Sequence, residues 1–145
     1  MPKSQKPKKK HVPVPRAKLK HHLTSNSLAN SIRTYLHLPI MSFEFGGPTA
    51  RNWRKLGLAL YILSVATDNE AHIDRADKIA IDSALLYIDS IADRELRTGQ
   101  WYAAPEELVA LKRGAVAGSN IVGTLEFRLL ASAYQTVAKA RRDVL

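Results

Sequence analysis

Apolar residues recur every three or four positions along most of the chain, which is the spacing of one face of an α-helix. The first such pattern lies in TSNSLANSIRTYLHLP, where Ser and Asn residues stand at the start of the pattern and Pro39 follows it. Its apolar positions are Leu28, Ile32, Tyr35 and Leu36. Since proline lacks the backbone donor and its ring clashes with the preceding turn, we expect this helix to end at Pro39.

The next stretch, IMSFEFGGP, predicts a short extended link and then a turn. Met41, Phe43 and Phe45 alternate toward one side, as they would in an extended segment. Two adjacent glycines, Gly46 and Gly47, indicate that the chain turns before the next helix.

A second helix is predicted from Pro48, which stands where the first turn of a helix favours proline, to about Ala66. After Lys55 its residues are apolar nearly all round. A helix without a polar face is buried on all sides, so we expect this one at the centre of the fold.

A third helix is predicted from the capping-box pattern Thr67-Asp68-Asn69-Glu70, in which the threonine and glutamate side chains each bind a free backbone N–H group. Gly99 favours the left-handed conformation that ends many helices. The apolar positions between these two signals are Ile73, Ala76, Ala80, Ala84, Tyr87 and Ile91. We expect this stripe to face the core.

The last helical region begins at Pro105 and continues to about residue 142. Its length favours two helices, with a break near Gly118–Asn120, although the pattern leaves a single helix open. Ala110, Gly114 and Gly118 repeat every four residues and would form a smooth ridge for close helix contact. Trp101 and Tyr102, just before this region, are expected to cap the core rather than to anchor a partner.

These patterns predict an all-α fold, a small bundle of four or five helices in one domain over residues 23–145. The longest apolar run is Leu56–Ala66, much shorter than the roughly 20 residues that cross a bilayer, so we expect no membrane span. The chain has no cysteine and therefore no disulfide or thiolate zinc site. A cytoplasmic protein, nuclear if eukaryotic, is the expectation.

Charge is concentrated at the N-terminus. The chain has 22 Lys and Arg and 13 acidic residues, and residues 1–22 contain eight of the former and none of the latter, so the remainder is nearly neutral. The eight are Lys3, Lys6, Lys8, Lys9, Lys10, Arg16, Lys18 and Lys20. With four prolines and few apolar residues, this segment is expected to be a disordered basic arm.

Such an arm favours binding to nucleic acid, because each cation that meets a phosphate releases condensed counterions. An acidic protein or an anionic membrane surface would attract the same charges, and a solubilising terminus is the plainer alternative. The sequence PKKKHVPVPR also fits a nuclear localisation signal in a eukaryotic protein.

A second cationic cluster lies in GGPTARNWRK, at the start of the second helix. Arg51, Arg54 and Lys55 stand where the helix dipole disfavours cations. A phosphate bound at the helix N-terminus would be attracted both by these cations and by the positive end of the dipole. Trp53 would then supply a stacking surface. The alternative is that these cations are exposed or locally paired on a helix that Trp53 anchors.

The acidic stretch TDNEAHIDRAD contains the pattern most similar to a metal or acid–base site. At about 100° per residue, His72 lies far round the helix from Glu70 and Asp74, so these side chains do not converge. We therefore expect no metal, no cofactor and no catalytic residue here. The acids Asp82, Asp89 and Asp93 further along are expected to face solvent, or to bind the basic arm or a basic partner.

The chain lacks the sequence motifs of serine and metal hydrolases and of dinucleotide enzymes. We expect a small non-enzymatic regulatory or accessory protein that binds nucleic acid through the arm and the Arg51, Arg54 and Lys55 cluster. The alternative is a helical protein–protein adaptor, as a monomer or a homodimer, whose arm only solubilises it. A hydrolase that uses Glu70, His72 and Asp74 is a distant third.

Overall fold

The computed structural model describes residues 16–68 and 72–144 of the chain. In these ranges all regular structure is helical, which confirms the predicted all-α bundle. The helices are α1 (Arg16–Phe45), α2 (Ala50–Thr67), α3 (Arg75–Thr98), α4 (Pro105–Thr124) and α5 (Phe127–Val144).

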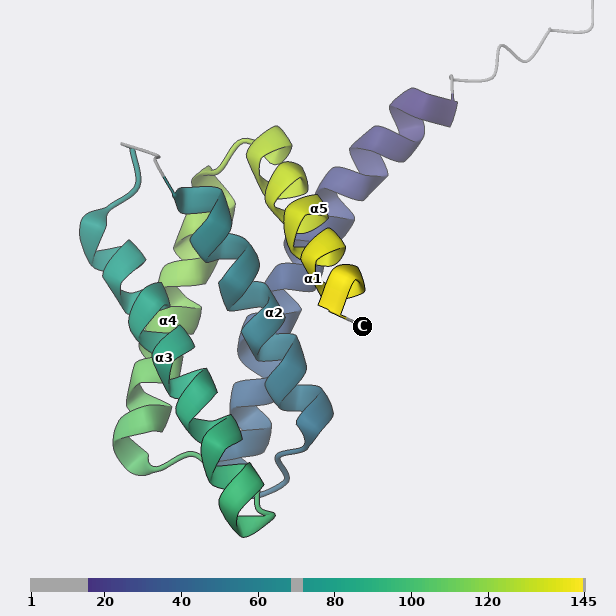
Figure 1. The fold of residues 1–145 in the computed structure, drawn as a ribbon. Coiled ribbons are helices and arrows are strands. Elements are labelled where there is room, and N and C mark those ends of the chain that lie inside the picture. The colour runs from purple at the N-terminus through teal and green to yellow at the C-terminus, as the bar shows by residue number, and fades with distance from the viewer. Residues whose placement is uncertain (1–15, 69–71, 145) are drawn as a thin grey trace, which may run out of the picture.

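Helices α1 to α4 form a four-helix bundle, and α5 packs on the outer side of α2 (Figure 1). In the bundle α1 contacts α2 and α4, and α3 contacts the same two helices. Helix α2 contacts all four of the others, and residues along most of its length are buried. The predicted central position of the second helix is thus confirmed, because α5 covers the side that a four-helix bundle alone would leave exposed.

Helix α1 is longer than predicted, because it continues through Pro39 to Phe45. The predictions that it ends at Pro39 and that an extended link follows are therefore wrong. Buried residues on one helical face lie on both sides of the proline, at Leu36, Ile40 and Phe43. Their burial offsets the roughly 3 kcal/mol that a proline costs inside a helix. The hydroxyl of Ser42 also donates to the carbonyl oxygen of Pro39 at 2.7 Å.

The first residue of α1 is Arg16, which directly follows the last proline of the N-terminal segment. Residues 16–22 of the predicted arm are thus part of this helix. The rest of the arm, residues 1–15, lies outside the described residues.

The start of α2 is fixed by a turn and a cap. Gly46 has a φ of 83°, a left-handed conformation that favours glycine, and the chain turns there as predicted. Thr49 then caps α2, since its hydroxyl accepts a hydrogen bond from the Asn52 N–H at 3.2 Å. Pro48 lies just before this cap and not in the first turn.

The start of α3 differs from the capping box that the sequence predicts. Thr67 is the last residue of α2, and its buried hydroxyl donates to the Leu63 carbonyl oxygen at 2.8 Å. Thr67 therefore belongs to the end of α2 and does not stand at the start of α3, which begins at Arg75. Asp74 caps α3 instead, by accepting from the Ala76 N–H at 2.9 Å. Of the predicted box, Asn69 and Glu70 lie outside the described residues.

Most of the predicted core-facing stripe of α3 faces the core: Ala84 and Ile91 are buried, and Ile73, Ala80 and Tyr87 are partly buried against it. Ile81 and Ile88 complete the buried face, whereas the predicted Ala76 is exposed. Gly99 ends the helix as expected, in a left-handed conformation with a φ of 71°.

Two helices follow Pro105, but they are divided at Leu125 and Glu126 and not near Gly118. The glycines of α4 serve contact between helices. A Cβ atom on Gly114 would lie 2.5 Å from that of Ala84, and one on Gly118 would lie 2.8 Å from Leu63 Cδ1. The predicted ridge for close helix contact is therefore present. Because Gly118 lies in close contact with neighbouring helices, packing favours a helix that continues there without a break.

Candidate nucleic-acid interface

The helices divide into a basic group and a nearly neutral group. Helix α2 has three cations and no acid, and the only acids of α1 and α5 are Glu44 and Asp143. Most acids of the other helices are on α3, at Asp77, Asp82, Asp89, Asp93 and Glu95. Since α1 and α5 both pack against α2, the three basic helices share one part of the molecule, which we call the basic side (Figure 1).

Several cations outside the basic side are neutralised by acids. Lys78 pairs with Asp68 at 2.6 Å, and Arg94 pairs with Glu107 at 2.7 Å. The α4 residue Lys112 pairs with Glu44 of α1 at 2.6 Å. The last of these pairs also neutralises the only acid of α1.

Arg51 and Arg54 occupy the first two turns of α2, and both side chains are exposed. Neither takes part in an ion pair with a described residue. They stand at the positive end of the helix dipole without a compensating acid, which is unfavourable in the free protein. An anion bound at this position would interact favourably with both guanidinium groups and with the helix end.

The other two members of the predicted cluster have partners within the fold. Lys55 lies over the ring of Tyr35, with 5.3 Å between its ammonium nitrogen and the ring centroid. The indole N–H of Trp53 donates to the Ile88 carbonyl oxygen at 2.7 Å, and its ring lies 5.3 Å from that of Trp101. Trp53 thus anchors α2 on α3, and only Arg51 and Arg54 of the cluster are directed to solvent.

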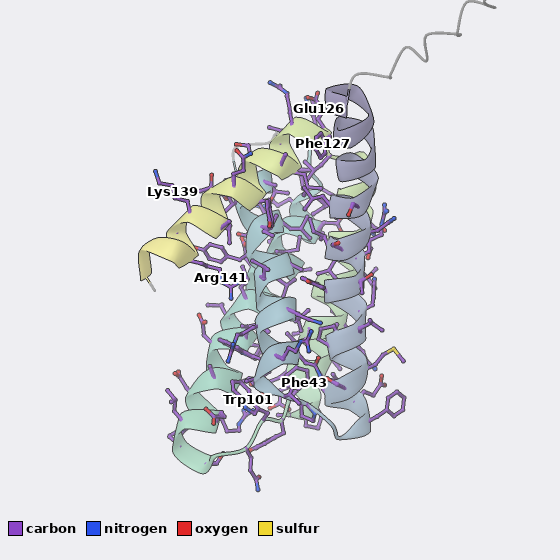
Figure 2. All side chains as sticks on the ribbon, turned by 90° about the vertical axis from the view of Figure 1, so that its right-hand side faces the viewer. Phe43, Trp101, Glu126, Phe127, Lys139 and Arg141 are labelled. Carbon is purple, nitrogen blue, oxygen red and sulfur yellow. The ribbon has the colours of Figure 1, made fainter. Side chains whose placement is uncertain are left out.

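Helix α5 adds cations that the sequence patterns did not assign to a site. Lys139 and Arg141 are exposed and form no ion pair within the described part of the chain. Figure 2 shows both near the C-terminal end of α5, which crosses the bundle obliquely. The helix dipole alone explains cations in the last turns of a helix, so their presence there does not indicate a binding site. Only the packing of α5 against α2 puts them on the basic side.

The cations of the predicted arm fall in two groups. Arg16, Lys18 and Lys20 belong to the first turns of α1. The remaining five, Lys3, Lys6, Lys8, Lys9 and Lys10, lie outside the described residues.

The acidic stretch before α3 forms no metal site in the part of it that the structure describes. No group of three or more His, Asp and Glu side chains converges anywhere among the described residues. Asp74 is used as the helix cap, with its carboxylate on the Ala76 N–H. Glu70 lies outside the described residues.

One pair of side chains with catalytic chemistry was not predicted from the sequence. His37 Nε2 of α1 and Ser119 Oγ of α4 are 2.6 Å apart. Ser119 lies inside α4, where the surrounding backbone N–H groups are used in the helix and offer no donors for an oxyanion. The pair therefore acts as an interhelical hydrogen bond.

The chain matches no protein-family model, no curated protein and no solved structure. No helix in the described ranges combines the length and the apolar character needed to cross a membrane.

Proposed function

We propose that this is a small non-enzymatic regulatory or accessory protein that binds nucleic acid through its basic arm and its basic side. The observation that carries the proposal is the distribution of charge. Arg51 and Arg54 of α2 and Lys139 and Arg141 of α5 are exposed without an ion-pair partner among the described residues. Their helices and α1 together contain two acids, whereas the exposed Arg75, Arg97 and Arg113 of α3 and α4 lie on helices with seven. Such a protein would act in the cytoplasm, or in the nucleus of a eukaryote.

The physical basis is the release of counterions from phosphates. No acidic residue precedes Glu44 in the chain, so the arm and most of α1 present positive charge without local competition. The arm leads into the start of α1, whereas Arg51 and Arg54 follow the end of this helix of 30 residues, about 45 Å away along its axis. A polyanion that contacts both groups of cations therefore has to extend along α1. Binding of this kind depends on charge and salt and requires no catalytic group.

Replacing Arg51, Arg54 and Lys139 with glutamine tests the basic side. If all three contact phosphates, the slope of log affinity against log salt should fall in magnitude by about 2.7. The matched control replaces Arg75, Arg97 and Arg113 of α3 and α4 with glutamine, which removes the same charge elsewhere. Fluorescence anisotropy with a labelled duplex at several salt concentrations measures both slopes. An equal fall in slope in the two variants would show that binding depends on net charge and not on the basic side.

A second candidate, a helical adaptor or homodimer, is favoured by an apolar strip on α1. Leu38, Met41 and Phe45 recur at helical spacing and have 59%, 50% and 78% of their surface exposed. On the neighbouring helix α4, Val109 and Val116 are also exposed. An exposed apolar strip along one face of a helix, like that of α1, is typical of contact surfaces between proteins.

This candidate predicts a dimer that depends on the α1 strip. Sedimentation velocity should then show the wild type as a dimer and the variant Leu38→Gln with Phe45→Gln as a monomer, because the contact loses its apolar area. Helix content by circular dichroism should not change, since both side chains are exposed. A wild type that sediments as a monomer at all concentrations would rule out the homodimer.

A further inference from the structure

The first turns of α1 stand clear of the rest of the molecule (Figure 1). The helix begins at Arg16, and Leu28 is the first of its residues with a described side chain that packs against the core. Residues 16–27 make about three helical turns and extend about 18 Å. This length of helix continues without a break into the part of α1 that belongs to the bundle.

The sequence of this projecting segment is basic. Residues 16–26 contain Arg16, Lys18 and Lys20, two histidines and no acid. The first turn of α1 also lacks the acidic residue that would favour its positive end. A helix of three turns with cations at its N-terminus gains little stability from its own sequence. An anionic surface alongside it would stabilise both the charges and the helix end.

We propose that residues 16–27 of α1 bind in the major groove of double-stranded DNA, an inference that rests on the proposed function. The major groove of B-form DNA is about 12 Å wide and admits one α-helix, with phosphates along both edges. The corresponding groove of an RNA duplex is deep and narrow, and a single strand has no groove. A projecting basic helix therefore fits the DNA duplex best among these three.

The bundle orients this helix. Helix α1 has no break at Pro39 and is held by α2 and α4 along the part that follows Leu28. The projecting turns are therefore presented at a fixed angle to the basic side. Phosphates beside the groove would then be within reach of the arm, which leads directly into α1.

The test is a helix-breaking substitution that leaves the charge unchanged. Leu23→Pro interrupts the projecting turns, and the matched control Leu23→Ala shortens the same side chain but keeps a good helix former. Binding is measured by fluorescence anisotropy with duplex DNA, duplex RNA and single-stranded DNA of equal length. We expect wild type and Leu23→Ala to prefer duplex DNA by about tenfold, and Leu23→Pro to lose this preference.

A thermal melt keeps the result interpretable, because it shows whether the replacement of Leu23 has also destabilised the bundle. If Leu23→Pro melts lower, the variant Leu19→Gly with Leu23→Gly weakens the helix more mildly and repeats the test. Equal binding of duplex DNA by Leu23→Pro and Leu23→Ala would overturn the groove assignment, as would equal binding of duplex RNA by the wild type. Failure of the wild type to bind all three probes would instead overturn the proposed function.

Discussion

Deletion of residues 1–22 should lower the affinity for duplex DNA by at least about a hundredfold at low salt. The deleted segment contains eight of the chain's 22 Lys and Arg residues. If all eight meet phosphates, the salt slope should fall in magnitude by about 7. The melting temperature should not change, because the deleted residues precede Leu28, where the described contacts of α1 with the core begin.

A full-length variant with the eight cations replaced by glutamine controls for chain length. It should bind as weakly as the deletion variant, since both lose the same charges. Anisotropy titrations and thermal melts of the two variants provide the measurements. Full affinity in the deletion variant would place binding on the folded helices alone and would reduce the arm to a solubilising terminus.

Replacement of Arg94 should have the largest effect on stability. Glu107 is 3% exposed, and its Oε1 atom lies 2.7 Å from Arg94 Nη1 and 2.8 Å from the Ala104 nitrogen. Arg94 also donates to the Tyr102 carbonyl oxygen at 2.9 Å, and its guanidinium lies 4.4 Å from the centre of the Tyr102 ring. These contacts hold the loop between α3 and α4. The hydrogen bond to Glu107 raises the pKa of Arg94 from an already high value, so the guanidinium remains charged at physiological pH.

Arg94→Met leaves the Glu107 carboxylate buried without its cation, and we expect a loss of about 3 kcal/mol in the free energy of unfolding. Lys112→Met removes a similar but more exposed pair and should cost at most about 1 kcal/mol. Denaturant unfolding measures both. The double variant Arg94→Met with Glu107→Leu should recover most of the loss, because no buried charge remains. A loss below about 1 kcal/mol in Arg94→Met would show that the carboxylate is solvated or protonated at little cost.

Local patterns predicted the class of fold because helical spacing of apolar residues extends over most of the chain. The central position of α2 follows from its lack of a polar face, and the left-handed end of α3 follows from the glycine at position 99. The errors occurred where a local signal competed with packing. Burial of Leu36, Ile40 and Phe43 carries α1 through Pro39. Likewise, close contact with α1 and α2 keeps α4 unbroken at Gly118.

The candidate interface was predicted only in part, for similar reasons. Arg51 and Arg54 were identifiable because cations at a helix start oppose the dipole. The role of Trp53 depends on the Ile88 carbonyl oxygen, which is 35 residues distant in sequence, so no local pattern indicates it. Lys139 and Arg141 join the basic side only because α5 packs back onto α2. Charge along the sequence was visible, but its division between two groups of helices was not.

The most direct test of the account is a salt titration of the full-length protein with a labelled DNA duplex. Log affinity should fall linearly with log salt concentration, and the slope should have a magnitude of about 7 if the eight cations of residues 1–22 meet phosphates. Cations of the basic side that also contact phosphate would make the slope steeper. Absence of binding at low salt, or an affinity that does not change with salt, would contradict the central claim that this protein binds nucleic acid through the cations of its arm and its basic side.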